Sequence, residues 1–398
     1  MSKSKDLDSI LKGIDISPTM YRNAVDKYKA VATCLEKAGF SADIFPQGSF
    51  RTGTVARPLI DGVEREYDLD LICLVPAERF MNNPGALKKE IGDALRKGGY
   101  DGKLKEYDRC WTLDYADVSD IGFRLDIVPS IPQDAGYVSA LANGGINIRY
   151  AKEALKITEK VTEESFGWAN SNPEGFALWF DDLNSRFAET LRWAQRQAIY
   201  EANMEMYGSV DDVPSLLERS SLQSAIQIMK RHRDMFYTQA HEWDERPISV
   251  ILVSLAAKIS QHAPTDADVV DLLAFIVGDL EVYGRMLLEG SAEQPYSDGS
   301  KRGYVQKQPE CWEIKNPVDG NDNYADSWTD KTARLFFKWV QALAVDLADL
   351  TKGGNSHRAA MENIFGRKSV DSVLGPAAVA TIPILVGGVK PWRSNVLL

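Results

Sequence analysis

Long apolar runs are missing from this sequence. No stretch of about 18 apolar residues, the length that crosses a membrane as a helix, occurs among the 398 positions, so we expect no membrane span. The N-terminus, Met-Ser-Lys-Ser-Lys-Asp, also lacks the apolar core of a secretion signal. These absences argue against the membrane and secreted classes and predict a cytoplasmic protein.

Cysteine and histidine are both scarce. The cysteines show no Cys-x-x-Cys spacing and are expected to be reduced thiols (Cys34, Cys73, Cys110 and Cys311). The histidines show no metal-ligand spacing, which argues against a zinc site (His232, His241, His262 and His357). The sequence also lacks a nucleophilic-serine elbow and a Cys/His pair.

Two common ligand-binding loops are imitated but incomplete. The segment from Gly98 to Leu104 has the wrong spacing for a Walker A loop, and no Ser or Thr follows Lys103. The segment from Asp319 begins like a calcium loop, but Tyr324 occupies the place where the sharp turn needs glycine. We therefore interpret the second segment as a turn.

Excess positive charge is also absent. The net charge is −11, whereas proteins that bind long nucleic acids present a basic surface to the phosphates. Mononucleotides remain possible ligands, because metal ions and a few local cations can neutralise their phosphates. The charge therefore favours small nucleotides over a polymer, although a local basic groove would still permit RNA.

The most informative stretch that is present runs from residue 46 to residue 75. Asp68 and Asp70 begin a strand whose remainder is apolar on both faces, so the strand is expected to be interior. Side chains alternate along a strand, so these two carboxylates share one face about 7 Å apart, an arrangement that suits divalent cations. Upstream, Gly48 and Ser49 can present backbone N–H groups and a hydroxyl to a phosphate.

The first part of the chain mixes helices and strands. A helix is predicted over 17–39, because Ser17 can cap it, Pro18 suits its first turn and Gly39 can end it. A further helix is predicted over 86–97. Short strands are predicted at 43–46 and 67–75, and a hairpin at 105–116 and 121–129. This order predicts an α+β fold with a small mixed or antiparallel sheet.

Helical periods dominate from about residue 150. We predict helices over 152–165, 176–207, 215–238, 247–262, 266–289 and 329–350. The polar segment 290–328 is expected to be an ordered loop, the polar stretch 351–375 to be mobile, and Ile382–Val389 to form a strand or lie across a groove. We divide the chain into a core with an N-terminal helix, 1–200, and a mainly helical lobe with a C-terminal tail, 201–398.

A third acid, Asp126, lies in the second strand of the predicted hairpin. Alone it would more often cap a turn or pair with Arg124. With Asp68 and Asp70 one hairpin away, it completes a set that can hold two Mg²⁺ or Mn²⁺ ions. Such a pair of ions clamps the attacking and leaving oxygens of a phosphoryl displacement.

Two later segments fit the same chemistry. Lys230 lies beside the apolar stripe of a helix that Ser220 caps, and we favour it as a triphosphate contact. For Arg231 we expect a solvated position. Ser249 follows Pro247 at the start of another helix, where free N–H groups can meet a phosphate. The alternative is that Ser249 is only a first-turn helix residue.

Taken in order, these motifs resemble the polymerase-β-like nucleotidyltransferases. Three stretches narrow the resemblance to the bacterial cGAS/DncV-like nucleotidyltransferases, which make cyclic oligonucleotide signals in antiphage defence: Gln47–Thr54, Ala225–Asp234 and Asn316–Trp328. The resemblance covers about residues 17 to 350. It implies a nucleotidyltransferase core, a helical lobe and an active-site cleft between them.

The resemblance also implies a role for each matched residue. Asp68, Asp70 and Asp126 would hold two metal ions, and Asp126 would lie nearest the attacking hydroxyl. The donor triphosphate would lie between Gly48 and Ser49 on one side and Lys230 and Ser249 on the other. The 312–328 loop would lie near the nucleotide or brace the lobes.

We therefore expect a synthase that joins nucleoside triphosphates, ATP among them, into a cyclic di- or trinucleotide. A separate effector would sense the product, and operon-encoded regulators could act on the enzyme. Two alternatives remain open at this point. One is a nucleotidyltransferase that extends RNA or transfers AMP to a protein, and the other is a nucleotide-binding module without catalysis.

Overall fold

A mixed seven-stranded sheet forms one half of the molecule. The computed structural model describes residues 2–60, 63–115, 122–187, 192–288, 303–352 and 354–376. The main strand order is β1-β4-β7-β6-β5, and β8 joins β7 to β9. The strands are β1 (Asp43–Pro46), β4 (Tyr67–Leu74), β5 (Leu104–Glu106), β6 (Trp111–Tyr115), β7 (Phe123–Pro132), β8 (Leu155–Thr162) and β9 (Ser165–Ser171).

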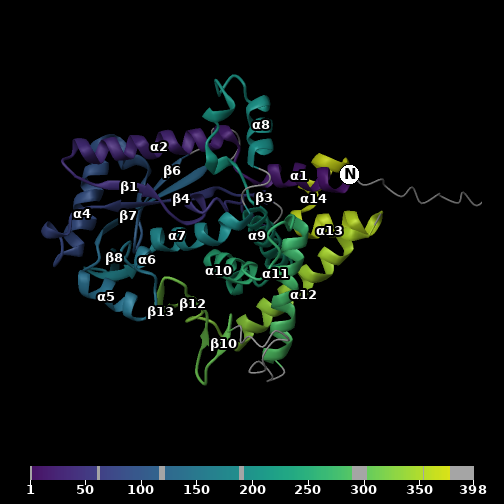
Figure 1. Ribbon diagram of the computed structural model, residues 1–398. Coiled ribbons are helices and arrows are strands. Elements are labelled where there is room, and N and C mark those ends of the chain that lie inside the picture. Colours follow the sequence, from purple (N-terminus) through teal and green to yellow (C-terminus); the bar gives the residue numbers. More distant parts are fainter. Residues whose placement is uncertain are drawn as a thin grey trace, which may run out of the picture.

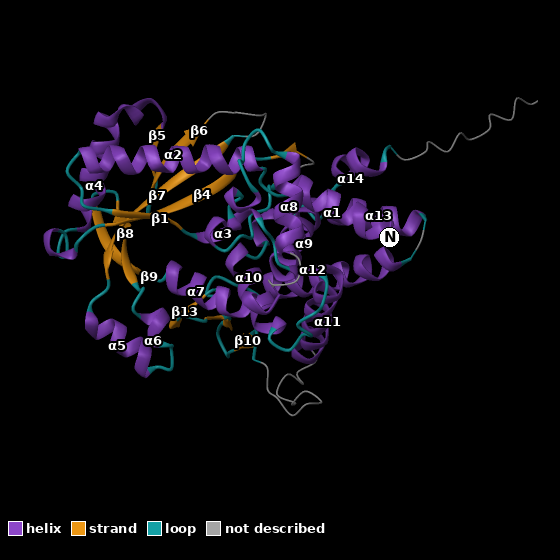
Figure 2. Ribbon diagram, turned by 45° about the horizontal axis from the view of Figure 1, so that its top comes forward, coloured by secondary structure: helices purple, strands orange, loops and turns teal. Residues whose placement is uncertain are grey.

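The predicted α+β fold and mixed sheet are confirmed. β4 and β7 are parallel, whereas the pairs β1–β4, β6–β7, β5–β6 and β7–β8 are antiparallel. The predicted hairpin is present as β6 and β7, but the segment 105–116 contains two strands, β5 and β6, joined by a turn. Helix α2 (Pro18–Lys37) crosses one side of the sheet, and α7 (Pro173–Asn184) and α10 (Ser249–Ser260) lie on the other (Figures 1 and 2).

The start of α2 follows from its capping residues. Ser17 accepts a hydrogen bond from the backbone N–H of Met20, and Pro18 occupies the first turn, where its missing N–H is not needed. Its buried side chains, Ala24, Val31 and Leu35, join α4 (Pro84–Leu95) and the strands in one hydrophobic cluster. This cluster fixes the sheet that carries the three acids.

The helix predicted over 152–165 is wrong. Residues 155–162 form β8, which pairs in antiparallel register with β9. Leu155 and Ile157 face the core with Lys156 between them, and this alternation, with the β-branched residues that follow, favours a strand. The helix predicted over 176–207 is described as two helices, α7 and α8 (Arg192–Ala202).

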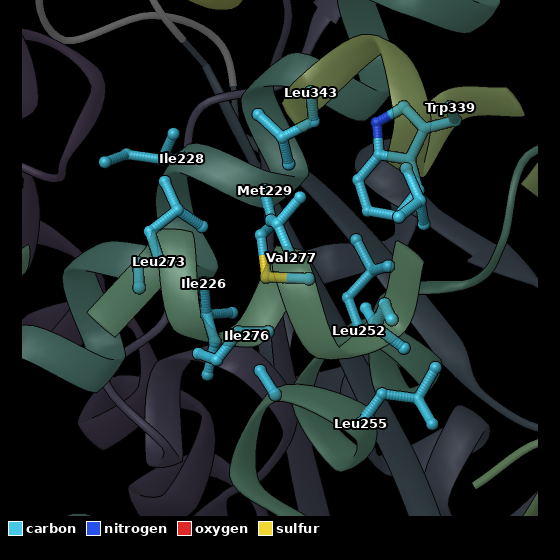
Figure 3. Packing of buried hydrophobic residues seen from close by; sticks show 14 of the residues in the cluster. Ile226, Ile228, Met229, Leu252, Leu255, Leu273, Ile276, Val277, Trp339 and Leu343 are labelled. Carbon is cyan, nitrogen blue, oxygen red and sulfur yellow. The ribbon is translucent and has the colours of Figure 1, made fainter. Parts of the chain in front are cut away.

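Helices form the other half of the molecule. Ile226, Ile228 and Met229 of α9 (Ser221–Gln239) interdigitate with α10, α11 (Val269–Leu288) and α12 (Asp330–Thr351) (Figure 3). α1 (Ser2–Ile14) packs into the same cluster although it lies at the start of the chain. Over the described residues, no helix combines the length and apolar character that a membrane span needs. Our division of the chain at residue 200 stays a prediction.

The stretch 351–375, expected to be mobile, instead contains α13 (Asn355–Phe365) and α14 (Arg367–Leu374). Its apolar residues recur at helical spacing and are buried in the lobe (Ala360, Met361, Ile364, Phe365 and Val370). The high polar content concealed this narrow stripe. Ile382–Val389 lies outside the described residues.

The predicted ordered loop is confirmed where it is described, over 303–328. It forms two small hairpins, β10 (Gln306–Lys307) with β11 (Trp312–Glu313), and β12 (Lys315–Asn316) with β13 (Asp319–Asn323). The Asp319 carboxylate accepts the N–H of Asn321, which agrees with our interpretation of a turn. The remaining short elements are β2 (Leu59–Ile60), β3 (Val63–Glu64), α3 (Gly48–Arg51), α5 (Ala135–Asn143) and α6 (Ile148–Ala151).

Candidate active site

Two of the three acids lie side by side on neighbouring parallel strands. In the β4–β7 register Asp70 is the direct partner of Asp126, and Asp68 is the partner of Arg124. Parallel partners on adjacent strands project to the same face and are separated by the strand spacing of about 4.8 Å. Asp68 lies two positions along β4 and shares that face. The register therefore gathers the three predicted acids on one surface of the sheet.

The electrostatics of these acids reflect their closeness. Burial raises the pKa of Asp70 to about 7, and the negative charges of Asp126 and Asp68 add to this rise. The pKa of Asp68 is raised as well, first because the surrounding protein displaces solvent and then because Asp126 is nearby. Like charges on adjacent strands are costly unless a cation offsets them.

Asp126 is oriented by the strand on its other side. Thr112 is its antiparallel partner in β6, and the Thr112 hydroxyl donates a 2.5 Å hydrogen bond to the Asp126 Oδ1 atom. Thr112 is buried, so this bond is shielded from water. Cys110 lies two residues before Thr112, with its Sγ 3.6 Å from the threonine hydroxyl. One carboxylate oxygen of Asp126 is therefore held in place by a buried neighbour.

The predicted phosphate turn packs directly against Asp70. The backbone N–H of Gln47 donates to the Asp70 carbonyl over 2.8 Å. Gly48 has a φ of +62°, and a Cβ atom there would lie 2.8 Å from the Asp70 Oδ2 atom. Glycine is needed at this position both for the left-handed backbone and for the close approach. The turn therefore places Ser49 beside the acids.

One face of α9 is polar and binds the backbone that follows this turn. The side chains of Gln223, Gln227, Lys230 and Arg231 donate to the carbonyls of Thr52, Val55, Thr54 and Arg57, respectively, over 2.6–2.9 Å. Their spacing of four, three and one residues is that of one helix face. The signal was present in the sequence, since polar residues recur opposite the apolar stripe. From the sequence we had interpreted Lys230 and Arg231 but not Gln223 and Gln227.

Lys230 lies where the sequence placed it, on the wall of the cleft, and it is buried. Its ammonium group donates to the Thr54 carbonyl at 2.9 Å and to the Thr54 hydroxyl at 3.1 Å. Burial, with the nearby Arg233, lowers the pKa of Lys230 to about 7. A lysine ammonium has three donors, so these two bonds leave it able to meet a phosphate oxygen.

Arg231 does not occupy the solvated position that we expected. The side chain is buried, and its Nε atom donates to the Phe365 carbonyl at 3.2 Å. Its other nitrogens donate to the Arg57 carbonyl, to Glu64 and to the Ser369 hydroxyl. Arg231 thus connects the segment after the phosphate turn to α13 and α14. It is a structural residue, because all of these partners lie in the protein.

Ser249 is the first residue of α10, and Pro247 precedes the helix. The Ser249 hydroxyl accepts a hydrogen bond from the Arg233 guanidinium over 3.1 Å, and the same nitrogen donates to the Pro247 carbonyl. The hydroxyl hydrogen remains available to an acceptor in the cleft. The structure therefore brings Ser249 to the cleft but also gives it a neighbour within the protein.

A cleft of about 530 Å³ lies between the sheet and the helical lobe. Six of the seven predicted site residues line it (Gly48, Ser49, Asp68, Asp70, Lys230 and Ser249). Asp126 is not among the described lining residues, and it lies beside Asp70 under the hydrogen bond from Thr112. The cleft thus unites segments about 200 residues apart in the sequence.

Several lining residues were not identified from the sequence. Arg109 comes from the β5–β6 turn, Asn170 and Asn172 from the end of β9 and the residue after it, and Asp319 and Asp322 from β13. No local motif marks these positions, because they reach the cleft only through strand pairing and the packing of the lobes. The 312–328 loop was expected near the nucleotide, and four of its residues line the cleft (Asn316, Asp319, Asp322 and Tyr324).

The three acids have the donor chemistry of a site for a hard divalent cation. Carboxylate oxygens are the usual ligands of Mg²⁺, and such an ion would offset both the burial of Asp70 and the negative charges of Asp126 and Asp68, which together raise the pKa of Asp70. Within the described ranges, no group of three or more His, Cys, Asp and Glu side chains converges as a formed metal site. The residue types and their negative charge fit such an ion.

Known proteins resemble this chain in sequence. The model of the Second Messenger Oligonucleotide or Dinucleotide Synthetase (SMODS) domain matches residues 1–184. A c-di-GMP synthase of Roseivirga ehrenbergii is 24% identical over 370 residues, covering 90% of this chain and 83% of that protein. The cyclic dinucleotide synthase CdnG of Bradyrhizobium diazoefficiens is 29% identical over 262 residues, covering 62% of this chain and 57% of that protein.

The fold agrees over nearly the whole chain. The solved structure of the CD-NTase CdnG of Bradyrhizobium diazoefficiens, in complex with GTP, has a TM-score of 0.67 to this chain at 21% identity. The match covers 94% of this chain and 98% of that one, and so includes both the sheet and the helical lobe. The matched SMODS domain contains the phosphate turn and all three acids. The chain belongs to the bacterial cGAS/DncV-like nucleotidyltransferases.

Proposed function

We propose that this chain joins nucleoside triphosphates into a cyclic di- or trinucleotide and releases pyrophosphate. The observation that carries the proposal is the parallel pairing of Asp126 with Asp70, which lines a cleft together with Ser49 and Lys230. This arrangement puts acidic side chains beside groups that can bind a triphosphate. The two relatives, a c-di-GMP synthase and a cyclic dinucleotide synthase, support the same reaction.

In the proposed reaction, the cleft holds two nucleotides in line. Ser49 and Lys230 bind the donor triphosphate, with Ser249 at the far wall. The 3′-hydroxyl of the acceptor attacks the donor α-phosphorus, a new P–O bond forms, and the bond to pyrophosphate breaks. Asp126, oriented by Thr112, lies nearest the hydroxyl and favours loss of its proton. A second such step within the linear product closes the ring.

Asp68, Asp70 and Asp126 would hold the metal ions, which we propose to be two Mg²⁺ or Mn²⁺. Bound there, such ions lower the pKa of the attacking hydroxyl and offset the charge that develops on pyrophosphate. The residues themselves supply the negative surface on which the ions would bind. The proposal thus gives a use to carboxylates that otherwise repel one another.

We propose GTP as a substrate, because a related chain is described in complex with GTP and another as a c-di-GMP synthase. ATP, expected from the sequence, is the second candidate. The product would act in the cytoplasm as a second messenger for antiphage defence, sensed by a separate effector protein. The family description, which names second messenger synthesis, supports this role.

The test is incubation of the purified chain with four NTPs and Mg²⁺ or Mn²⁺, followed by phosphatase and mass spectrometry. We expect a phosphatase-resistant cyclic product that contains guanine. The double variant D68N/D70N should form none, while D43N, an exposed acid at the start of β1, should retain activity. Label transferred to RNA or protein in place of a small product would support the macromolecule-modifying alternative and overturn the proposal.

A further inference from the structure

The cleft has few cations for a site that must accept two nucleotides. Of the described lining residues, two are Lys or Arg, namely Arg109 and Lys230, against four acids (Asp68, Asp70, Asp319 and Asp322). Lys230 is buried and bound to Thr54 on the donor wall. The Arg109 side chain is 60% exposed. Arg109 is therefore the cation that projects into the solvent of the cleft.

Arg109 is carried by a turn that the protein holds rigidly. The turn joins β5 to β6 and is closed by a hydrogen bond from the Tyr107 N–H to the Cys110 carbonyl. Beneath it lies Lys88 of α4, fully buried, whose ammonium donates to the carbonyls of Tyr107 at 2.7 Å and Cys110 at 2.8 Å. From the side, the Lys160 N–H donates to the Asp108 carbonyl.

Holding this turn with Lys88 has a cost in free energy. Burial lowers the pKa of Lys88 to about 8, so keeping its charge inside costs free energy. Its two hydrogen bonds go to the two ends of the turn. A surface turn without a function has little need for a buried lysine. Preorganisation of the residue at its tip, Arg109, gives this arrangement a purpose.

The turn lies on the Asp126 side of the acids. From Cys110 the chain enters β6, where Thr112 orients Asp126, while Gln47 and Gly48 of the phosphate turn pack against Asp70 on the other side. In the proposed reaction Asp126 lies nearest the attacking hydroxyl, so its side of the cleft receives the acceptor nucleotide. Arg109 is thus placed next to the acceptor and across the acids from the donor triphosphate.

In the absence of nucleotide, Arg109 has a replaceable partner. Its Nε atom donates to Glu159 of β8 at 2.8 Å, and both side chains reach solvent. An exposed ion pair of this kind contributes about 0–1 kcal/mol, so a phosphate can displace the carboxylate at small cost. A guanidinium can donate two parallel N–H bonds to two oxygens of a phosphate, whereas Glu159 offers Arg109 a single carboxylate oxygen.

We propose that Arg109 binds the 5′-triphosphate of the acceptor nucleotide during the first bond-forming step. This inference rests on the proposed function and adds the recognition of the acceptor's phosphates. The acceptor triphosphate does not react in that step, because the bond that breaks is the donor's α–β linkage. Its β- and γ-phosphates leave as pyrophosphate only in the second step, when the linear product has rebound with this triphosphate as the donor. Arg109 therefore selects a triphosphate over a monophosphate as the first acceptor.

The test uses nucleotides that can act in only one role. 2′,3′-Dideoxy-GTP has no hydroxyl to attack and serves only as donor. α,β-Methylene-GTP resists cleavage at its α-phosphorus and serves as an acceptor with three phosphates, and GMP serves as an acceptor with one. Linear dinucleotide is quantified for each acceptor. We expect the wild-type kcat/KM to be about tenfold or more higher for the triphosphate acceptor, as charge-assisted contacts allow.

In R109Q this preference should disappear, while kcat/KM for GMP stays near the wild-type value. R109K should restore part of the preference. E159Q, which releases Arg109 from its partner, should lower KM for the triphosphate acceptor. The matched control is R79Q, because Arg79 is also exposed and paired with a carboxylate, Glu90, but does not appear among the described lining residues.

Equal losses for both acceptors in R109Q, or no loss, would overturn the assignment of Arg109. So would a wild-type enzyme that shows no preference between the two acceptors. These results differ from failure of the proposed function, in which the wild-type chain would form neither linear nor cyclic product from the four natural NTPs.

Discussion

The two walls of the cleft treat their charges in opposite ways. On the sheet side, Asp68 and Asp70 face the cleft near Asp126, and the pKa values of both are raised, although the nearby Arg124 offsets part of the charge of Asp68. On the α9 side, Lys230 and Arg231 are buried, and backbone carbonyls accept their hydrogen bonds. Charge that is only partly compensated marks the wall where we propose that a ligand binds, whereas the charges of the α9 wall are satisfied within the fold.

This comparison implies that the sheet side gives up stability for chemistry. Neighbouring acids are destabilising in a folded protein, and the proposed catalytic role would account for their presence here. The polar side chains of α9, in contrast, stabilise the fold. They supply the hydrogen bonds that the 52–57 backbone would otherwise make in a sheet. Four substitutions test the contrast, and we take them from the largest expected effect to the smallest.

The largest effect is expected for D70N. Turnover of the NTPs should fall about a thousandfold or more, because the acid at the centre of the proposed metal site is lost. Stability should not fall with it. Asp70 has a folded pKa of about 7 against an ordinary 3.8, so its stabilising contribution exists at low pH and is lost as the pH rises through 7. Thermal unfolding without metal at pH 8 should therefore show D70N as stable as wild type or more so.

A D70N variant that is inactive and also clearly less stable at pH 8 would contradict this contrast, because it would give Asp70 a structural role. Repeating the melt with Mg²⁺ sharpens the test. Wild type should gain stability from the ion, and D70N should gain less.

The second prediction concerns R231M on the opposite wall. Removing the guanidinium leaves buried carbonyls of Arg57 and Phe365 without their donor, so unfolding in urea should show a loss of about 2–4 kcal/mol. The control is R367M on α14, whose side chain is 71% exposed and should change stability by less than about 0.5 kcal/mol. If R231M keeps full stability but loses activity, Arg231 belongs to the site and our structural assignment is wrong.

Lys230 belongs to the α9 wall and also lines the cleft. The pH dependence of the free energy of unfolding tests how its burial affects stability. Its folded pKa of about 7 lies below the ordinary 10.5, so the unfolded chain binds more protons between these values. Stability contributed through Lys230 therefore rises as the pH increases from 7. Relative to K230M, the wild-type free energy of unfolding should increase by about 2–3 kcal/mol between pH 7 and pH 9. Wild-type and K230M free energies of unfolding that change equally across this range would refute the lowered pKa of the buried Lys230.

The smallest effect is expected for T112V, which keeps the shape of the side chain and removes the hydroxyl. Asp126 then loses the donor that fixes one of its oxygens, so kcat should fall about tenfold, equivalent to one misplaced hydrogen bond. The change in stability should stay within about 1 kcal/mol, measured by thermal unfolding. T112S, which keeps the hydroxyl, should retain most of the activity, and an equal loss in both variants would indicate a packing effect.

Local patterns determined much of this protein. The period of two along 67–75 placed Asp68 and Asp70 on one face, and the Ser17 and Ser220 caps began their helices where expected. Such features depend on residues within one turn or one strand, which a sequence displays directly. The family resemblance also followed from short motifs in a fixed order, and the SMODS match agrees with it.

The tertiary structure decided what lies opposite what. The sequence placed Asp126 near the other acids, but only the β4–β7 register made it the partner of Asp70. Arg231 looked like a solvated charge because its partners, Arg57 and Phe365, are more than 130 residues away. Arg109 carried no local signal at all, since Lys88 and strand pairing bring it to the cleft. Periodicity shows which side chains lie on the same face of a helix or strand, whereas only long-range packing determines which residues that face contacts.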